Sequence, residues 1–261
     1  MRTIKGIDVS TLQGRITWPL VAADGIEFAM IKATQGRGEG VLTRHLKRFT
    51  DGKFVTNIKG AADAGIKCGV YHYLTAQSIA EAKAEAAYFC AAIEPYRSRI
   101  KLWAAVDVES EMYVGKLGRY ELAKIIRAFM AVLEDHGLKP MLYTNPNYLT
   151  YKLPEHEFED VPIWLAHWGV AKPLTVPNTM IWQYGLTTVK GISGNVDANT
   201  GYFDTALLPT YKNGDKYLIK KGDIYTNGRA VPSRLVGKEF TVMQVREDRI
   251  LLGEISSWVK I

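Results

Sequence analysis

LWAAVDVES, residues 102–110, runs through apolar side chains and then ends on two acids, Asp107 and Glu109. The apolar positions are consecutive rather than alternating, which is typical of a parallel strand buried on both faces. Parallel strands of this kind are covered by helices. The stretch therefore predicts an interior strand of an α/β fold.

Helix-like sequence flanks this strand on both sides. One predicted helix begins at Ser78, whose S-x-x-E pattern with Glu81 is typical of a capping box, and runs to about Ala92. The other has apolar residues at helical spacing from Leu122 to Leu133. A glycine suited to a helix C-cap follows helix-like sequence in DGIEF at 24–28, AGIKC at 64–68 and HGLKP at 136–140. Helix, turn and strand therefore recur along the chain.

The predicted strands are short and apolar, and they cover residues 4–9, 27–32, 68–73, 102–108, 140–144, 162–166 and 180–184. Alternating strands and helices indicate an α/β fold that is either a closed barrel or an open, doubly wound sheet. An open dinucleotide-binding sheet would need G-x-G-x-x-G after its first strand, where this chain has DVSTLQG. Proline-bearing sequence at 167–179 leaves little room for a late helix, so a barrel formed by this chain would be irregular.

The pattern changes near LPTYKNGDKY, residues 208–217, which is typical of a linker. Short β-type runs joined by NG, VG and ED turns follow it. We therefore predict a barrel domain over residues 1–207, a linker over 208–217 and a small all-β module over 218–261.

Composition excludes disorder, because 47% of residues are hydrophobic and 23% are charged. The formal net charge is +6, and residues 210–261 hold 10 basic against 6 acidic residues. A basic surplus suits a polyanionic partner, although solubility alone also explains it. Cys68 and Cys90 lack C-x-x-C spacing, so we expect two reduced, buried thiols rather than a disulfide framework.

The two acids that end the central strand share one face, because residues i and i+2 of a strand point the same way, about 6.5 Å apart. Side chains at the C-terminal ends of barrel strands point into the mouth where chemistry occurs. Burial raises the pKa of a carboxyl and a like charge pushes two pKa values apart, so one acid of Asp107 and Glu109 is expected to hold a proton. A structural pair explains D-x-E alone equally well.

Other predicted strand ends carry the same kinds of side chain. Asp8 closes the first strand and Asp197 lies near the end of the last. The late-strand aromatic residues are Tyr71, Tyr73, Tyr143, Trp164, Trp168, Trp182 and Tyr184. Aromatic residues are usually core, and half of these suit that role. Acids ringed by tyrosine and tryptophan are nevertheless what a carbohydrate cleft needs, since sugar faces stack on rings and hydroxyls bind carboxylates.

The chain resembles the glycoside hydrolase family 25 lysozymes, the muramidases common among phage endolysins. The matching motifs are GIDVSTLQG (6–14), IKATQG (31–36), YHY (71–73), DVE (107–109), YTN (143–145), WLAHW (164–168), WQYG (182–185) and DANTGYF (197–203). They cover about the first 205 residues in the right order. The resemblance implies hydrolysis of the β-1,4 bond between N-acetylmuramic acid and N-acetylglucosamine, without a metal or cofactor. It also implies an α/β fold of the irregular, TIM-like (βα)5β3 barrel type.

The resemblance also implies roles for the acids. Glu109 would be the general acid, and Asp107 would orient the substrate's own acetamido group, which replaces an enzyme nucleophile. Asp8 and Asp197 would bind sugar and tune that pair. The residues expected to bind substrate are Lys32, Gln35, Tyr71, Tyr73, Tyr143, Trp164, Trp168, Trp182 and Gln183. Lys32 suits an ion pair with one of the acids equally well.

One position departs from the family pattern, because Gln35 stands where the family usually has glutamate. The amide removes a negative charge from the cleft, which should favour ionised forms of the other acids and lower the pH optimum. His72 alternates to the opposite face from its tyrosine neighbours, so we expect a packed, hydrogen-bonded residue and not a ligand.

The C-terminal run resembles the bacterial SH3-type modules that bind cell walls. Peptidoglycan and acidic wall polymers are therefore the expected partners, and nucleic acid and membrane are not expected. The N-terminus lacks the apolar core of a signal peptide, so we expect synthesis in the host cytoplasm and action after release. A peptidoglycan-binding protein without turnover and a chitin-type hydrolase are the alternative functions.

Overall fold

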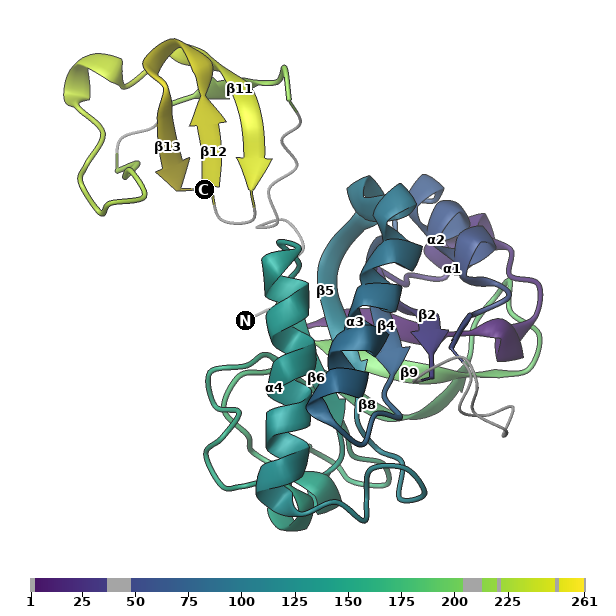
Figure 1. The fold of residues 1–261 in the computed structure, drawn as a ribbon. Coiled ribbons are helices and arrows are strands. Elements are labelled where there is room, and N and C mark those ends of the chain that lie inside the picture. The colour runs from purple at the N-terminus through teal and green to yellow at the C-terminus, as the bar shows by residue number, and fades with distance from the viewer. Residues whose placement is uncertain (1–2, 37–47, 204–212, 220–221, 247–248, 261) are drawn as a thin grey trace. The chain divides into compact units, whose positions relative to one another are not determined.

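The computed structural model describes residues 3–36, 48–203, 213–219, 222–246 and 249–260 (Figure 1). The chain folds into two compact units, Met1–Asp204 and Thr205–Ile261. Part of the predicted linker, residues 208–212, lies outside the described residues.

Eight strands close a barrel in the first unit. Their order around it is β1 (Ile4–Val9), β2 (Phe28–Gln35), β4 (Lys67–Tyr73), β5 (Ile100–Asp107), β6 (Pro140–Thr144), β7 (Ile163–Ala166), β8 (Thr179–Thr188) and β9 (Asn195–Gly201), and β9 returns to β1. The first seven run parallel, whereas β9 is antiparallel to both β8 and β1. A two-residue strand, β3 (Phe49–Thr50), adds to β2. The predicted irregular barrel is confirmed, but β9 was missed as a strand.

Helices cover only part of this barrel. The α-helices are α1 (Trp18–Ala23), α2 (Phe54–Asp63), α3 (Ile79–Ile93) and α4 (Arg119–Asp135), with short turns η1 (Thr11–Gln13), η3 (Glu94–Arg99) and the π-type η4 (Tyr148–Lys152). In Figure 1, α3 and α4 lie side by side along the barrel, and they contact each other. Among the described residues no α-helix lies between β7 and β8, as the proline-bearing sequence predicted. The short η4 follows β6, and β8 leads directly to β9.

Three helices end in the predicted way. Gly25, Gly65 and Gly137 all have positive φ, between 66° and 88°. The N–H of the apolar residue after each glycine reaches back to a carbonyl five residues earlier, as from Leu138 to Leu133. Each turn therefore feeds the chain from a helix into the next strand at a fixed angle.

The capping box predicted for α3 differs in one bond. Ser78 Oγ accepts the Glu81 N–H at 3.2 Å, but the Glu81 carboxylate accepts from the N–H of Gln77 and not from that of Ser78. The hydrogen bond from the backbone to the Glu81 carboxylate is thus made one residue closer to the N-terminus than in a standard capping box.

His72 lies on the outer face of β4, fully buried against the helices, as expected from its position between two tyrosines. Its Nε2 lies 2.6 Å from Glu85 Oε2 on α3, and its Nδ1 lies 2.7 Å from Thr34 Oγ1 on β2. Thr75 donates both its N–H and its hydroxyl to the same Glu85 carboxylate. This network ties β2, β4 and α3 together, so His72 is a structural residue.

The N-terminal end of the barrel is filled with side chains. Phe203 packs edge-on against Phe28 and Trp103, with centroids 5.3 and 4.9 Å apart. Gly6 makes room for this plug, because a Cβ there would lie 2.2 Å from the Phe28 ring. The free space inside the barrel is thereby confined to the opposite end, where the parallel strands finish.

The second unit is a four-stranded antiparallel sheet in the order β10 (Lys216–Leu218), β11 (Glu239–Arg246), β12 (Arg249–Leu252), β13 (Ser257–Lys260), with turns η6 (Ser233–Leu235) and η7 (Gly253–Ile255). Its own buried cluster is Tyr217, Ile219, Val231, Phe240, Val242, Ile250, Leu252 and Val259. The predicted all-β module is therefore present. Over the described residues of both units, none of the helices has the length and apolarity required to cross a bilayer.

Candidate active site

A cavity of about 260 Å³ opens at the C-terminal end of the barrel. It is lined by Asp8, Tyr71, Asp107, Glu109, Tyr143, Trp164, Trp168, Gln183 and Asp197. All nine were predicted as site residues, and they include the four acids. Side chains from segments as far apart as β1 and β9 therefore meet at one mouth.

The strand pattern explains how the central acids arrive there. Asp107 is the last residue of β5, and Glu109 follows two residues later on the same face. Between them, Val108 donates its N–H to Tyr143 O at 2.9 Å, and its carbonyl accepts from Thr144 Oγ1 at 2.8 Å. These bonds extend the strand geometry beyond β5 and hold Glu109 over the cavity.

Asp197 reaches the mouth by a different route. Because β9 is antiparallel to its neighbours, its first residues lie beside the last residues of β1. Asp197 is directly opposite Asp8 in this pairing. The two carboxylates therefore face one cavity although Asp197 is early in its strand.

The remaining predicted substrate-binding residues do not line the cavity. Lys32 Nζ donates to Gln35 Oε1 at 2.7 Å and lies over the Tyr73 ring, 5.1 Å from its centroid. Trp182 donates its Nε1–H to the carbonyl of His167 at 2.8 Å. Contact of these four residues with substrate stays a prediction.

Asp8 is held by two amides. Its Oδ2 accepts from Gln183 Nε2 at 3.0 Å and from Asn199 Nδ2 at 2.7 Å. Trp164 donates its Nε1–H to Asn199 Oδ1 at 2.7 Å, and this donor-only group fixes which way the amide faces. Sequence reasoning missed Asn199, although its position two residues after Asp197 puts both on one face of a strand.

Burial raises the pKa of all four acids. Burial first, and then the charge of Asp197, raise the pKa of Asp8 to about 7, against hydrogen bonds from the two amides that lower it. Burial raises the pKa of Asp197 as well. Asp8 therefore exchanges its proton close to neutral pH.

The central pair is affected unequally. Burial and then the charge of Glu109 raise the pKa of Asp107 well above its usual range. Burial also raises the pKa of Glu109, whereas Lys32 and a hydrogen bond from Tyr143 lower it. A proton shared by the pair therefore favours Asp107, the more buried carboxyl.

Asp107 has an unsatisfied atom. The residue is 5% exposed, and its Oδ1 has no hydrogen-bond partner among the described residues. A buried carboxylate oxygen without a donor is costly, so an N–H or O–H group from a ligand would be strongly favoured there. Groups of three or more His, Cys, Asp or Glu arranged to hold a metal ion do not occur in the described part of the chain.

The Gln35→Glu change should move the pH profile of peptidoglycan hydrolysis to higher pH. A carboxylate beside Lys32 would offset the lysine charge that lowers the pKa of Glu109. We expect the basic limb of hydrolysis against pH to rise by roughly half a unit. The same profile for Gln35→Met is the control, since it adds no charge; a shift of equal size there would contradict the electrostatic explanation.

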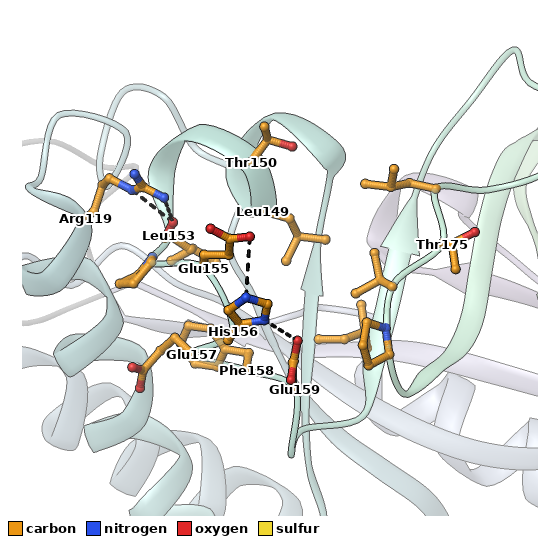
Figure 2. A pocket seen from close by; sticks show the side chains of 15 residues that line it. Arg119, Leu149, Thr150, Leu153, Glu155, His156, Glu157, Phe158, Glu159 and Thr175 are labelled. Atoms are coloured by element: carbon orange, nitrogen blue, oxygen red, sulfur yellow. Dashed lines mark hydrogen bonds and ion pairs between the residues drawn. The ribbon is translucent and has the colours of Figure 1, made fainter.

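A second, larger cavity of about 510 Å³ lies between η4 and the segments preceding β7 and β8 (Figure 2). Its walls are mainly apolar, and its rim carries His156 between Glu155 and Glu159, with Nδ1 2.5 Å from Glu159 Oε1. The Arg119 guanidinium donates to the carbonyl of Leu153. None of the four clustered acids lines it, so the smaller cavity is the candidate active site.

A barrel with paired carboxyls at its mouth and aromatic walls defines a glycoside hydrolase. The model of the Glycosyl hydrolases family 25 matches residues 7–192. The autolytic lysozyme of Clostridium acetobutylicum is 33% identical over 197 residues, which are 74% of this chain and 54% of that protein. Lysozyme M1 of Streptomyces globisporus is 32% identical over 209 residues, covering 75% of this chain and 67% of that protein. This chain belongs to glycosyl hydrolase family 25.

Solved structures agree with this assignment. The bacterial lysozyme from Streptomyces coelicolor superposes with a TM-score of 0.65 at 29% identity, over 78% of this chain and 94% of that one. The superposition on the spore cortex lytic enzyme SleM from Clostridium perfringens covers 99% of this chain and 86% of that one, with a TM-score of 0.70 at 20% identity. At that identity the second likeness concerns the fold alone.

Proposed function

We propose that the protein hydrolyses the β-1,4 bond between N-acetylmuramic acid and N-acetylglucosamine in bacterial peptidoglycan. The observation that carries this proposal is Asp107 Oδ1, a buried acceptor to which none of the described residues donates, in the same cavity as Glu109. The N–H of a sugar acetamido group is a donor of the required kind. Lysozymes among the relatives support the same substrate class.

The geometry suits acid catalysis assisted by the substrate. Glu109 gives its proton to the glycosidic oxygen as the bond from that oxygen to the sugar carbon breaks. The acetamido oxygen forms a new bond to the same carbon, and Asp107 stabilises the charge that develops on the acetamido nitrogen. Water then attacks the sugar carbon, Glu109 takes a proton from it, and the acetamido group is released.

Substrate binding also prepares the acid. Before substrate binds, the pKa of Asp107 is raised more strongly than that of Glu109, so the proton favours Asp107. An acetamido N–H bound to Asp107 stabilises its ionised form. The shared proton is thereby shifted towards Glu109, where the first step needs it.

The sugar at the newly formed reducing end tests the proposal. Purified peptidoglycan is digested and then reduced with borohydride, so that only reducing ends become alditols. Muramitol supports the proposed bond. Glucosaminitol, or release from chitin at a comparable rate, would favour a different acetamido-sugar hydrolase, and no release at all would favour a binding protein without turnover.

We propose further that the protein acts as an endolysin and that its second unit is an SH3-like module that binds the cell wall. The separate buried core and the surplus of basic residues in this part of the chain support that function. An inactive Glu109→Gln chain should sediment with purified walls. The same variant ending at Asp204 should bind about tenfold more weakly or worse. Equal binding by both chains would reject a wall-binding role for the second unit.

A further inference from the structure

The hydroxyl of Tyr143 has one proton and two acceptors. It donates to Gln183 Oε1 at 3.2 Å. Tyr143 is paired with Asp107 across β5 and β6 and lines the same cavity as Glu109, and hydrogen bonding from its hydroxyl lowers the pKa of the Glu109 carboxyl. Tyr143 is 7% exposed, and its ring is held against Trp164 with centroids 4.5 Å apart. Burial raises the pKa of Tyr143 well above its usual range, so the hydroxyl keeps its proton while the neighbouring carboxyls titrate.

The amide of Gln183 does not depend on Tyr143 for its hydrogen bonds. Trp168 donates its Nε1–H to Gln183 Oε1 at 2.9 Å. Because this N–H can only donate, it keeps the amide oxygen on the Tyr143 side and leaves Nε2 to donate to Asp8 Oδ2. The Tyr143 hydroxyl can therefore turn away from Gln183 without leaving a buried amide oxygen unsatisfied.

We infer that Tyr143 is a positioning residue that matches its hydrogen bond to the protonation state of Glu109, with Gln183 as the alternative acceptor. When Glu109 is ionised, Tyr143 donates to its carboxylate. When Glu109 is protonated, the carboxyl donates to the Tyr143 oxygen, and Tyr143 donates to Gln183 Oε1. The inference rests on the proposed function, in which Glu109 loses a proton in one step and regains it in the next.

This arrangement keeps Glu109 oriented in both steps. Only a hydroxyl rotation separates the two states, because the Tyr143 ring and the Gln183 amide are each held by a tryptophan. A carboxyl that stays hydrogen bonded in both forms needs little reorganisation between acid and base catalysis. The other titratable groups that act on Glu109 or on its partner Asp107 are Asp8, Lys32, Tyr71, Tyr73, Asp107, Tyr148 and Asp197.

Two substitutions should move the titration of Glu109 in opposite directions. Tyr143→Phe keeps the ring and removes the donor to the ionised carboxylate, so the pKa of Glu109 should rise, by about one unit. Gln183→Met removes the alternative acceptor, so that the Tyr143 hydroxyl donates to Glu109 alone. The pKa of Glu109 should therefore fall. Tyr202→Phe is the control, because it removes a hydroxyl from a partly buried ring that does not line the cavity.

The measurement is the carbon-13 NMR shift of the Glu109 carboxyl against pH in the full chain, together with the basic limb of kcat against pH. Opposite shifts for Tyr143→Phe and Gln183→Met, with Tyr202→Phe close to wild type, support the inference. An unchanged titration in Tyr143→Phe, or shifts of the same sign in both variants, overturns it. The NMR titration needs no turnover, so a wild-type chain that releases no muramitol would reject the proposed function alone.

Discussion

Replacing Glu109 by glutamine should lower the rate of peptidoglycan hydrolysis by at least about a thousandfold. The amide has nearly the same shape and still accepts the Tyr143 hydrogen bond, but it has no acidic proton to give to the glycosidic oxygen. The expected loss is in kcat, since the cavity walls are unchanged. Release of reducing ends from purified walls, measured with equal amounts of folded protein, provides the comparison.

Glu111→Gln is the matched control for this experiment. Glu111 lies two residues further along the same loop, outside the cavity lining, and its carboxylate pairs with Lys152 at 3.3 Å. An exposed ion pair of this kind contributes little, so the control should retain activity within about twofold of wild type. If Glu109→Gln kept more than a few per cent of the wild-type rate, another group would have to be the acid.

The parallel part of the barrel was predictable because its signals are local. A glycine with positive φ ends each of three helices, and an apolar run follows each glycine. Every such strand is buried on both faces, so the run is visible without knowledge of its partners. The antiparallel β9 has no such run, because NVDANTG places small and polar residues in the barrel wall. Its residue Asn199 was therefore missed together with the strand.

Site residues were predictable to the extent that strand alternation decides which side chains point inward. Gln183 and Trp182 were both expected to bind substrate, but adjacent residues of a strand face opposite sides, and only Gln183 lines the cavity. Near Lys32 the pairing of β2 with β4 shifts register between Lys32 and Thr34. An irregularity of this kind depends on the neighbouring strand, so a single sequence does not show it.

The electrostatics differ from the expectation in a physically simple way. Burial and mutual repulsion were both expected to act on Asp107 and Glu109, with one of the two acids holding a proton. In the structure burial is the largest cause for every one of the four acids, so the pKa values of Asp8 and Asp197 are raised as well. Lys32 acts against this rise at Asp107 and Glu109. The number of protons bound in the cavity therefore depends on four carboxyls and one lysine, and not on the D-x-E pair alone.

Asp107→Asn should reduce turnover by about a hundredfold to a thousandfold. Asparagine has the same shape but carries no charge, so it cannot stabilise the positive charge that develops on the acetamido nitrogen as its oxygen attacks the sugar carbon. Wild-type and variant rates are measured on normal walls and on walls from which the N-acetyl groups have been removed. A wild-type rate for the variant on normal walls would show that Asp107 does not act on the reaction.

The modified walls separate this role from a structural one. Without the acetyl group the substrate has no attacking oxygen, and an ammonium group replaces the amide N–H that would meet Asp107 Oδ1. Both proteins should then be slow, and the fold loss caused by Asp107→Asn should be much smaller than on normal walls, because the attack that Asp107 assists no longer occurs. An equal fold loss on both kinds of wall would instead mean that Asp107→Asn damages the cavity, for instance through its neighbour Glu109, and that the acetamido group is not its target.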